Sequence, residues 1–117
     1  MTYVDGFVVA VPKDKIDAYK TMSEACGKIW MEFGALTYVE CVADDVPYGE
    51  LTSFPRAVMA KEDETVVFSW ITYPSREKRD EINAKVMQDE RLKAFVETSP
   101  FDGKRMIYGG FTSLLEL

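Results

Sequence analysis

Histidine is absent from this 117-residue sequence. Its absence excludes the Ser-His-Asp and Cys-His arrangements of nucleophilic enzymes, the usual zinc sites and a histidine-ligated haem. Any general base must therefore be Asp, Glu, Lys, Tyr or Cys. Cysteine is scarce as well, because Cys26 and Cys41 are the only two and form no Cys-x-x-Cys motif. We expect both to be reduced residues that serve packing.

A targeting segment and a membrane-length apolar run are also lacking. The first twelve residues are too short to span a bilayer, contain Asp5, and have neither a basic leader nor a small-residue cleavage site. We therefore expect a cytoplasmic protein without membrane contact. The net charge of −6 opposes the phosphate backbone of nucleic acids, and basic residues of the second half alternate with acidic ones. We expect no nucleic-acid partner.

Four acidic residues lie close together in the sequence, where a strand is expected to end. They are Glu40, Asp44, Asp45 and Glu50. Carboxylates of this kind can bind a hard cation, but these four lack the spacing and the glycine of a calcium loop. We interpret them as a solvated acidic loop and expect neither a metal site nor a cofactor.

The pattern of apolar residues predicts one domain over residues 1–117, in the order strand, helix, strand, loop, strand, helix, strand. Strands are predicted at 3–11, 36–42, 65–73 and 105–115, with a short fifth strand at 56–60 that forms a hairpin with 65–73. Helices are predicted at 14–33 and 75–87, with a further short helical stretch at 90–96. This order predicts an α+β fold, the ferredoxin-like βαββαβ unit with an antiparallel sheet.

Several residues are expected to mark the ends of these elements. Asp14, Ser75 and Asp89 are predicted N-caps, and Gly34 is predicted to stop the first helix. The Gly109–Gly110 pair within the last strand predicts either a bulge or a close approach of the backbone.

The predicted strands are apolar on both faces. In the first strand the odd positions include Tyr3 and Phe7, and the even positions include Val4 and Val8. Residues 66–71 repeat this pattern. Because one layer of helices can hide only one face of a sheet, we expect the other face to meet a second copy of the chain. The predicted assembly is a homodimer that forms a dimeric α/β barrel.

The sequence resembles the YbaA-like family of uncharacterised bacterial proteins. The resemblance covers the whole chain in order and rests on the stretches YVDGF (3–7), ECVADDVP (40–47), TSFP (52–55), ETVVFSWI (64–71), RDEINAKVM (79–87) and PFDGKRMIYGGF (100–111). It implies membership of the dimeric α/β-barrel superfamily, in which two ferredoxin-like sheets pack face to face. Relatives there include cofactor-free monooxygenases, haem-degrading enzymes, muconolactone-type isomerases and ligand-binding stress proteins. The resemblance thus implies a fold and a pocket rather than a reaction.

Polar residues on the second predicted helix are candidates for ligand binding. Arg79 and Asn83 share one side of this helix and border its apolar stripe, so they either point into the cleft between helix and sheet or satisfy structural partners. Asp5 lies in an otherwise apolar strand. A buried carboxylate there has a raised pKa unless it is paired, which suits a general base or a structural partner of Arg79 or Arg105.

The remaining candidates lie near the ends of the strands. Tyr3, Trp70 and Tyr108 are either core or interface aromatics or the walls of a slot for a flat ligand. Asp102 belongs to an Asp-Gly turn and is available as a base, and Arg105 can hold an anion. One pocket is predicted between the second helix and the sheet, contacted by Arg79, Asn83, Trp70 and Tyr108 with Arg105 at its mouth.

Three classes of function are consistent with these residues. The preferred interpretation is a small-molecule binding protein, related to stress or metabolism, that uses the helix–sheet cleft. The alternative is a cofactor-free monooxygenase or isomerase acting on a phenol or enol, in which Asp5, Asp102 or Tyr108 handles a proton. The third is a protein whose dimer is itself the function.

Overall fold

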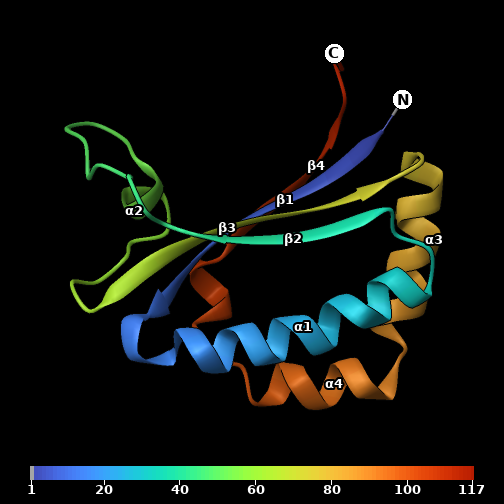
Figure 1. Cartoon of the computed structure of the whole chain (residues 1–117), viewed down its shortest axis with the longest axis horizontal. Coiled ribbons are helices and arrows are strands. Elements are labelled where there is room, and N and C mark those ends of the chain that lie inside the picture. The colour runs from blue at the N-terminus through green and yellow to red at the C-terminus, as the bar shows by residue number, and fades with distance from the viewer. Residues whose placement is uncertain (1) are drawn as a thin grey trace.

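Four strands form one antiparallel sheet in the order β2-β3-β1-β4 in a computed structural model that describes residues 2–117. The helices α1, α3 and α4 lie on one side of this sheet, and the two termini lie close together (Figure 1). The elements in chain order are β1 (Tyr3–Pro12), the 3-10 turn η1 (Lys13–Lys15), α1 (Ile16–Glu32), β2 (Thr37–Val42), α2 (Phe54–Ala57), β3 (Glu64–Tyr73), α3 (Arg76–Met87), α4 (Glu90–Glu97), the 3-10 turn η2 (Gly103–Arg105) and β4 (Ile107–Thr112). The predicted ferredoxin-like fold is confirmed.

The strand register decides which side chains face the helices. Phe7 lies opposite both Ser69 of β3 and Tyr108 of β4, and Glu40 of β2 also lies opposite Ser69. Residues directly opposite each other share a face, and successive residues of a strand alternate between faces. Phe7, Ser69 and Glu40 therefore point to the helix side of the sheet, whereas Trp70 points away from it.

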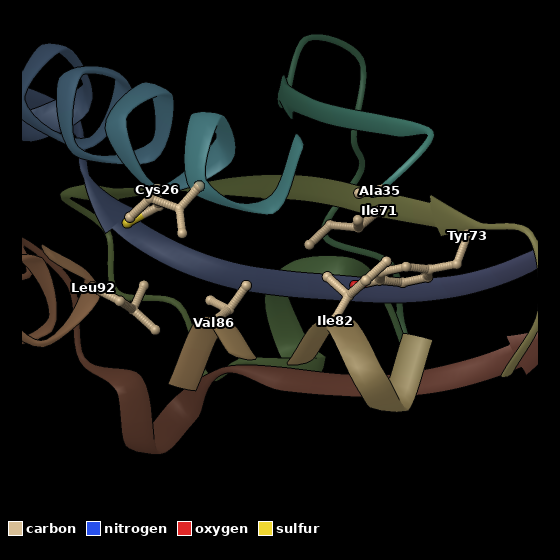
Figure 2. Packing of buried hydrophobic residues seen from close by; sticks show 8 residues of the cluster. Cys26, Ala35, Ile71, Tyr73, Ile82, Val86 and Leu92 are labelled. Atoms are coloured by element: carbon tan, nitrogen blue, oxygen red, sulfur yellow. The ribbon is translucent and has the colours of Figure 1, made fainter. Parts of the chain in front are cut away.

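The main core lies between the helices and the sheet. Figure 2 shows side chains of α1, α3 and α4 converging on Ile71 and Tyr73 of β3. Tyr73 and Val86 are completely buried. This cluster consists of Cys26, Ile29, Ala35, Ile71, Tyr73, Ile82, Val86 and Leu92.

Local sequence signals explain most of the helix ends. Ser75 and Asp89 accept hydrogen bonds from the backbone N–H groups of Lys78 and Arg91, so both predicted N-caps are confirmed. Gly34 adopts a φ of +115°, which explains why a glycine stops α1. Asp14 was predicted as an N-cap wrongly, because it lies inside η1, and α1 begins after Lys15 without a side-chain cap.

Two strand predictions are corrected. Residues 56–60 do not form a fifth strand, because the Ser53 side chain accepts a hydrogen bond from the Arg56 backbone N–H and starts the short helix α2. The last strand begins at Ile107 rather than at Arg105, because Asp102 caps η2 in the same way. It ends at Thr112.

The strand β4 passes through its two glycines without a bulge. Gly109 pairs with Gly6 and Gly110 with Asp5 in unbroken register. Close approach is the reason for glycine here, because a Cβ atom on Gly110 would lie 3.0 Å from Arg79 Nη2 and closer still to the Tyr3 hydroxyl.

The side of the sheet opposite α1, α3 and α4 carries apolar side chains, of which Val8 is buried in a second cluster with Val58, the residue after α2. We call the less covered part of this surface the open face, and it consists of Val4, Phe68, Trp70, Ile107 and Phe111. Phe68 is 42% and Phe111 62% exposed.

The two cysteines differ in burial. Cys41 is exposed, in contrast to the packing role expected for it, whereas Cys26 is buried. Within residues 2–117, no helix combines the length and the apolar character needed to cross a membrane.

Candidate functional site

Three of the predicted site residues meet around a buried ion pair, in which Arg79 binds Asp5 and also contacts Tyr3. Arg79 of α3 places Nη1 3.0 Å from Oδ1 of Asp5 and donates from Nη2 to the Tyr3 hydroxyl at 3.2 Å. Its guanidinium also lies over the Tyr3 ring, 4.9 Å from the centroid. The side chains of Asp5 and Arg79 are 7% and 19% exposed. The negative charge of Asp5 is thus balanced inside the protein by Arg79, and no ligand is needed to pair it.

Asn83 extends this network to α1 and β3. Its Nδ2 donates to Oδ2 of Asp5 at 3.5 Å, while its Oδ1 accepts from Trp30 Nε1 at 3.0 Å and from the Tyr73 hydroxyl at 3.4 Å. Burial, and then the neighbouring charge of Asp5, raises the pKa of Tyr73. Neither Arg79 nor Asn83 lines the two cavities described below. The network therefore matches the structural interpretation of Asp5 and Arg79.

The other predicted site residues lie elsewhere. Trp70 belongs to the open face, on the side of the sheet opposite α3. Arg105 binds both carboxylate oxygens of Glu64, at 2.8 and 2.7 Å, and this pairing lowers the pKa of Glu64 to about 2. Asp102 is exposed and accepts from Arg105 Nε at 3.1 Å.

Tyr108 is 73% exposed and stacks on Phe7 with centroids 6.5 Å apart. The structure therefore does not bring Arg79, Asn83, Trp70, Tyr108 and Arg105 around one pocket. Alternation of strand faces separates Trp70 from the others, and the pairing with Glu64 holds Arg105 away. Tyr108 shares a face with Phe7 but lies on the edge strand β4, where it is exposed.

A different cavity lies between the helices and the sheet. We call it the inner cavity, and its volume is about 220 Å³. Its apolar walls include Phe7, Met22, Trp30, Leu92, Val96, Phe101 and Met106. Five of its polar side chains form what we call the carboxyl cluster, which consists of Tyr19, Ser23, Tyr38, Glu40 and Ser69.

Glu40 is the acidic member of the carboxyl cluster. Its Oε2 atom is buried and has no hydrogen-bond partner. Burial raises the pKa of Glu40 above the usual 4.5, and the hydroxyl groups of Tyr19, Ser69 and Ser23 oppose this shift only in part. Glu40 is therefore a partly buried carboxyl group that lies among neutral hydroxyl groups and forms no ion pair within residues 2–117, unlike Asp5.

The two phenols of the cluster and the nearby Cys26 thiol remain protonated at neutral pH. Burial, and then the negative charge of Glu40, raises the pKa of Tyr19 and that of the Cys26 thiol. Burial also raises the pKa of Tyr38, although the hydrogen bond that its hydroxyl shares with Ser23 Oγ at 2.9 Å opposes the shift. The cluster thus combines one titrating carboxyl group with two neutral phenol donors.

A second hollow opens the cluster toward solvent. This outer groove, of about 540 Å³, follows α1 and β2 and shares Tyr19, Ser23, Tyr38 and Glu40 with the inner cavity. The helix approaches the sheet closely here because residue 27 is glycine. A Cβ atom on Gly27 would lie 2.7 Å from the Tyr38 ring. Glu40 thus lines both the outer groove and the inner cavity.

The sequence contained a signal for this site. Glu40 was grouped with the acidic residues that follow it, but the predicted strand 36–42 already placed Tyr38 and Glu40 on the same face. Ser23 also lies between Tyr19 and Cys26 on the helix side that the structure buries.

The other three residues of the acidic group, Asp44, Asp45 and Glu50, are exposed. Within residues 2–117, no three acidic or cysteine side chains converge as a metal site would require.

The raised pKa of Glu40 leads to a prediction about stability. Because the folded protein favours the protonated acid, ionisation of Glu40 costs stability as the pH rises from 4.5 through its folded pKa. Glu40→Gln, which is neutral throughout, is expected to raise the free energy of unfolding at neutral pH. The gain is about 1.4 kcal/mol for each unit by which the pKa is raised, and it disappears in acid. Urea unfolding between about pH 4 and 8 measures it.

The matched control is Glu50→Gln, which removes an exposed carboxylate nearby and is expected to change little at any pH. A loss of stability in Glu40→Gln at neutral pH would contradict the prediction, because it would mean that the charge is well paired.

Comparison with known proteins agrees with the resemblance found in the sequence. The model of a family described as "Protein of unknown function (DUF1428)" matches residues 2–103. The chain is 60% identical over 116 residues to the "Uncharacterized protein YbaA" of Escherichia coli K12, with 99% of each chain covered. The protein of that name in Shigella flexneri is 60% identical as well, over the same share of both chains. The predicted family is confirmed.

Solved structures agree with the fold. A NIPSNAP family protein from Agrobacterium tumefaciens has a TM-score of 0.61 and 18% identity, covering 96% of this chain and 92% of that one. A dimeric ferredoxin-like protein from an uncultured marine organism has a TM-score of 0.60 and 12% identity over 100% of both chains. At these identities the likeness shows the fold.

Proposed function

This chain belongs to the DUF1428 family of proteins of unknown function, and we propose that it binds a compact, largely apolar small molecule in the inner cavity. The observation that carries this proposal is the buried Oε2 atom of Glu40, which has no hydrogen-bond partner. A buried polar atom without a partner costs free energy, and a ligand that donates a hydrogen bond would remove that cost.

The cavity limits the size and the polarity of the ligand. Its volume of about 220 Å³ exceeds the roughly 150 Å³ of an apolar protein cavity that holds benzene. A molecule with one ring therefore fits. The apolar walls favour a hydrocarbon body, and the carboxyl cluster favours one hydroxyl group on it. A phenol or an enol combines these features.

Phenol and toluene provide a matched pair of probes for this proposal. Phenol is expected to bind and to raise the melting temperature more than toluene, because its O–H donates to Glu40. In Glu40→Leu, phenol is expected to lose about 1.5 to 3 kcal/mol of binding free energy, the scale of a hydrogen bond to a charged group, whereas toluene keeps its affinity. Titration followed by tryptophan fluorescence measures both, since Trp30 lines the cavity.

Glu50→Leu serves as the control, because Glu50 lies outside both hollows. Absence of binding by either probe would refute an accessible cavity. Equal loss of both probes in Glu40→Leu would show that the variant closes the cavity instead of removing a contact.

We further propose that two copies of the chain pair through the open face. This face has the apolar character of a protein interior and includes Trp70 and Phe111. The bare side of an antiparallel sheet is normally polar unless another layer covers it. One solved neighbour of the same fold is itself described as dimeric. In such a pair the inner cavities lie on the far sides of the two sheets, so binding does not require the partner.

A further inference from the structure

We propose that Glu40 transfers a proton to and from carbon, and that the substrate class is a one-ring ketone with an acidic hydrogen beside its carbonyl. This inference rests on the proposed binding in the inner cavity and adds a reaction to it. It depends on two observations: Glu40 lines that cavity, and no other group of residues 2–117 bonds to its buried Oε2 atom.

Glu40 differs from the other acids that the sequence put forward. Both oxygens of Asp5 are engaged, by Arg79 and by Asn83, and Asp5 lines neither the inner cavity nor the outer groove. Asp102 is exposed and bound to Arg105. Only Glu40 among these three faces an apolar cavity with a free oxygen. Burial also makes its carboxylate a stronger base than an exposed one, which favours removal of a proton from carbon.

Two phenol groups beside Glu40 can stabilise the charge that forms. Tyr19 and Tyr38 line the same cavity, and both stay protonated because burial raises their pKa. Ser23 shares a hydrogen bond with the Tyr38 hydroxyl and so orients it. A neutral O–H donor in an apolar site stabilises the oxygen of an enolate more than that of a ketone, because the enolate carries the greater negative charge.

For a β,γ-unsaturated ketone, the steps balance without a further reactant. A lone pair on Glu40 Oε2 takes the proton from the carbon between the carbonyl and the double bond, and the electrons of that C–H bond form the enolate. The oxygen receives the displaced carbonyl electrons and accepts a hydrogen bond from a tyrosine. The protonated Glu40 then returns the proton to the γ carbon, which restores the carbonyl. The product is the conjugated ketone, and Glu40 is again a carboxylate.

The test uses 3-cyclohexenone, a single ring, and its conjugated product 2-cyclohexenone. The wild-type protein is expected to convert the first into the second, followed by the ultraviolet absorbance of the conjugated ketone. In Glu40→Gln the rate is expected to fall about 100-fold or more, the usual contribution of a general base. Glu50→Gln is expected to retain the wild-type rate. Tyr19→Phe and Tyr38→Phe are expected to reduce the rate less than Glu40→Gln does.

Two further measurements separate this inference from the binding proposal. The rate is expected to rise with pH through the ionisation of Glu40, whose titratable neighbours are Tyr19, Tyr38 and Cys26, with Lys20, Glu24 and Lys28 along the outer groove. Binding of 2-cyclohexenone, measured by tryptophan fluorescence, is expected to persist in Glu40→Gln because the amide preserves the shape of the side chain.

Each outcome of this experiment supports or overturns one of the two proposals. Binding of the product without conversion of 3-cyclohexenone by the wild type overturns the proton-transfer role and leaves the binding site in place. Conversion at equal rates in the wild type and Glu40→Gln overturns the role of Glu40. Failure of the product to bind the wild type overturns the reaction, and it overturns the binding site as well only if phenol and toluene also fail to bind.

Discussion

Arg79→Ala is expected to destabilise the protein by about 3 to 5 kcal/mol, which is typical of removing one partner from a buried ion pair. The substitution leaves the Asp5 carboxylate, whose side chain is 7% exposed, without its cation. It also removes the donor to the Tyr3 hydroxyl. Thermal and urea unfolding of the purified variant, without any added ligand, measure the loss.

The double variant Asp5→Asn with Arg79→Ala is expected to recover part of this stability, because no buried charge is then left without a partner. Arg76→Ala is the matched control one turn earlier on α3. Its pair with Asp80, at 3.8 Å, is exposed, so a change of at most about 1 kcal/mol is expected. An equally small effect of Arg79→Ala would contradict the structural role and return Arg79 to the list of candidate ligand-binding residues.

The purified protein is expected to sediment at twice its chain mass of 13.3 kDa at micromolar concentration. A stable pair buries at least about 1,200 Å² in total, and the open face supplies the apolar surface for it. Phe111→Asp is expected to give a folded monomer. Phe111 is 62% exposed in the single chain, so a charge there disturbs the fold of one copy little but would be buried between two.

The control for this experiment is Leu36→Asp. It introduces the same charge at another half-exposed apolar residue, which lies outside the open face. Analytical ultracentrifugation of the three proteins gives the result, and circular dichroism checks that each is folded. A wild-type protein that sediments as a monomer would contradict the face-to-face pair.

Short-range patterns account for the parts of the fold that the sequence predicted correctly. The caps at Ser75 and Asp89 depend on a side chain and a backbone N–H within the next three residues, and the stop at Gly34 depends on one backbone angle. The wrong prediction of a strand at 56–60 also has a short-range cause. The apolar residues there suggested a strand, but the hydrogen bond accepted by Ser53 started a helix instead.

The candidate site could be predicted only in part because it combines distant segments. Asp5 and Arg79 are 74 residues apart, and the sequence offered both Arg79 and Arg105 as partners for this carboxylate. The structure assigns Arg105 to Glu64 instead. Glu40 shows the opposite case, since its sequence neighbours are solvated acids while its neighbours in space are phenols and apolar walls.

The sequence by itself determined the order of the elements, the two apolar faces of the strands and the absence of histidine chemistry. These properties depend on composition and on periodicity over a few residues. Only the tertiary structure decided that Asp5 has a cation and that Glu40 has none. The acidity of a carboxyl group depends on the atoms that surround it, and strand pairing and helix packing bring those atoms together from separate parts of the chain.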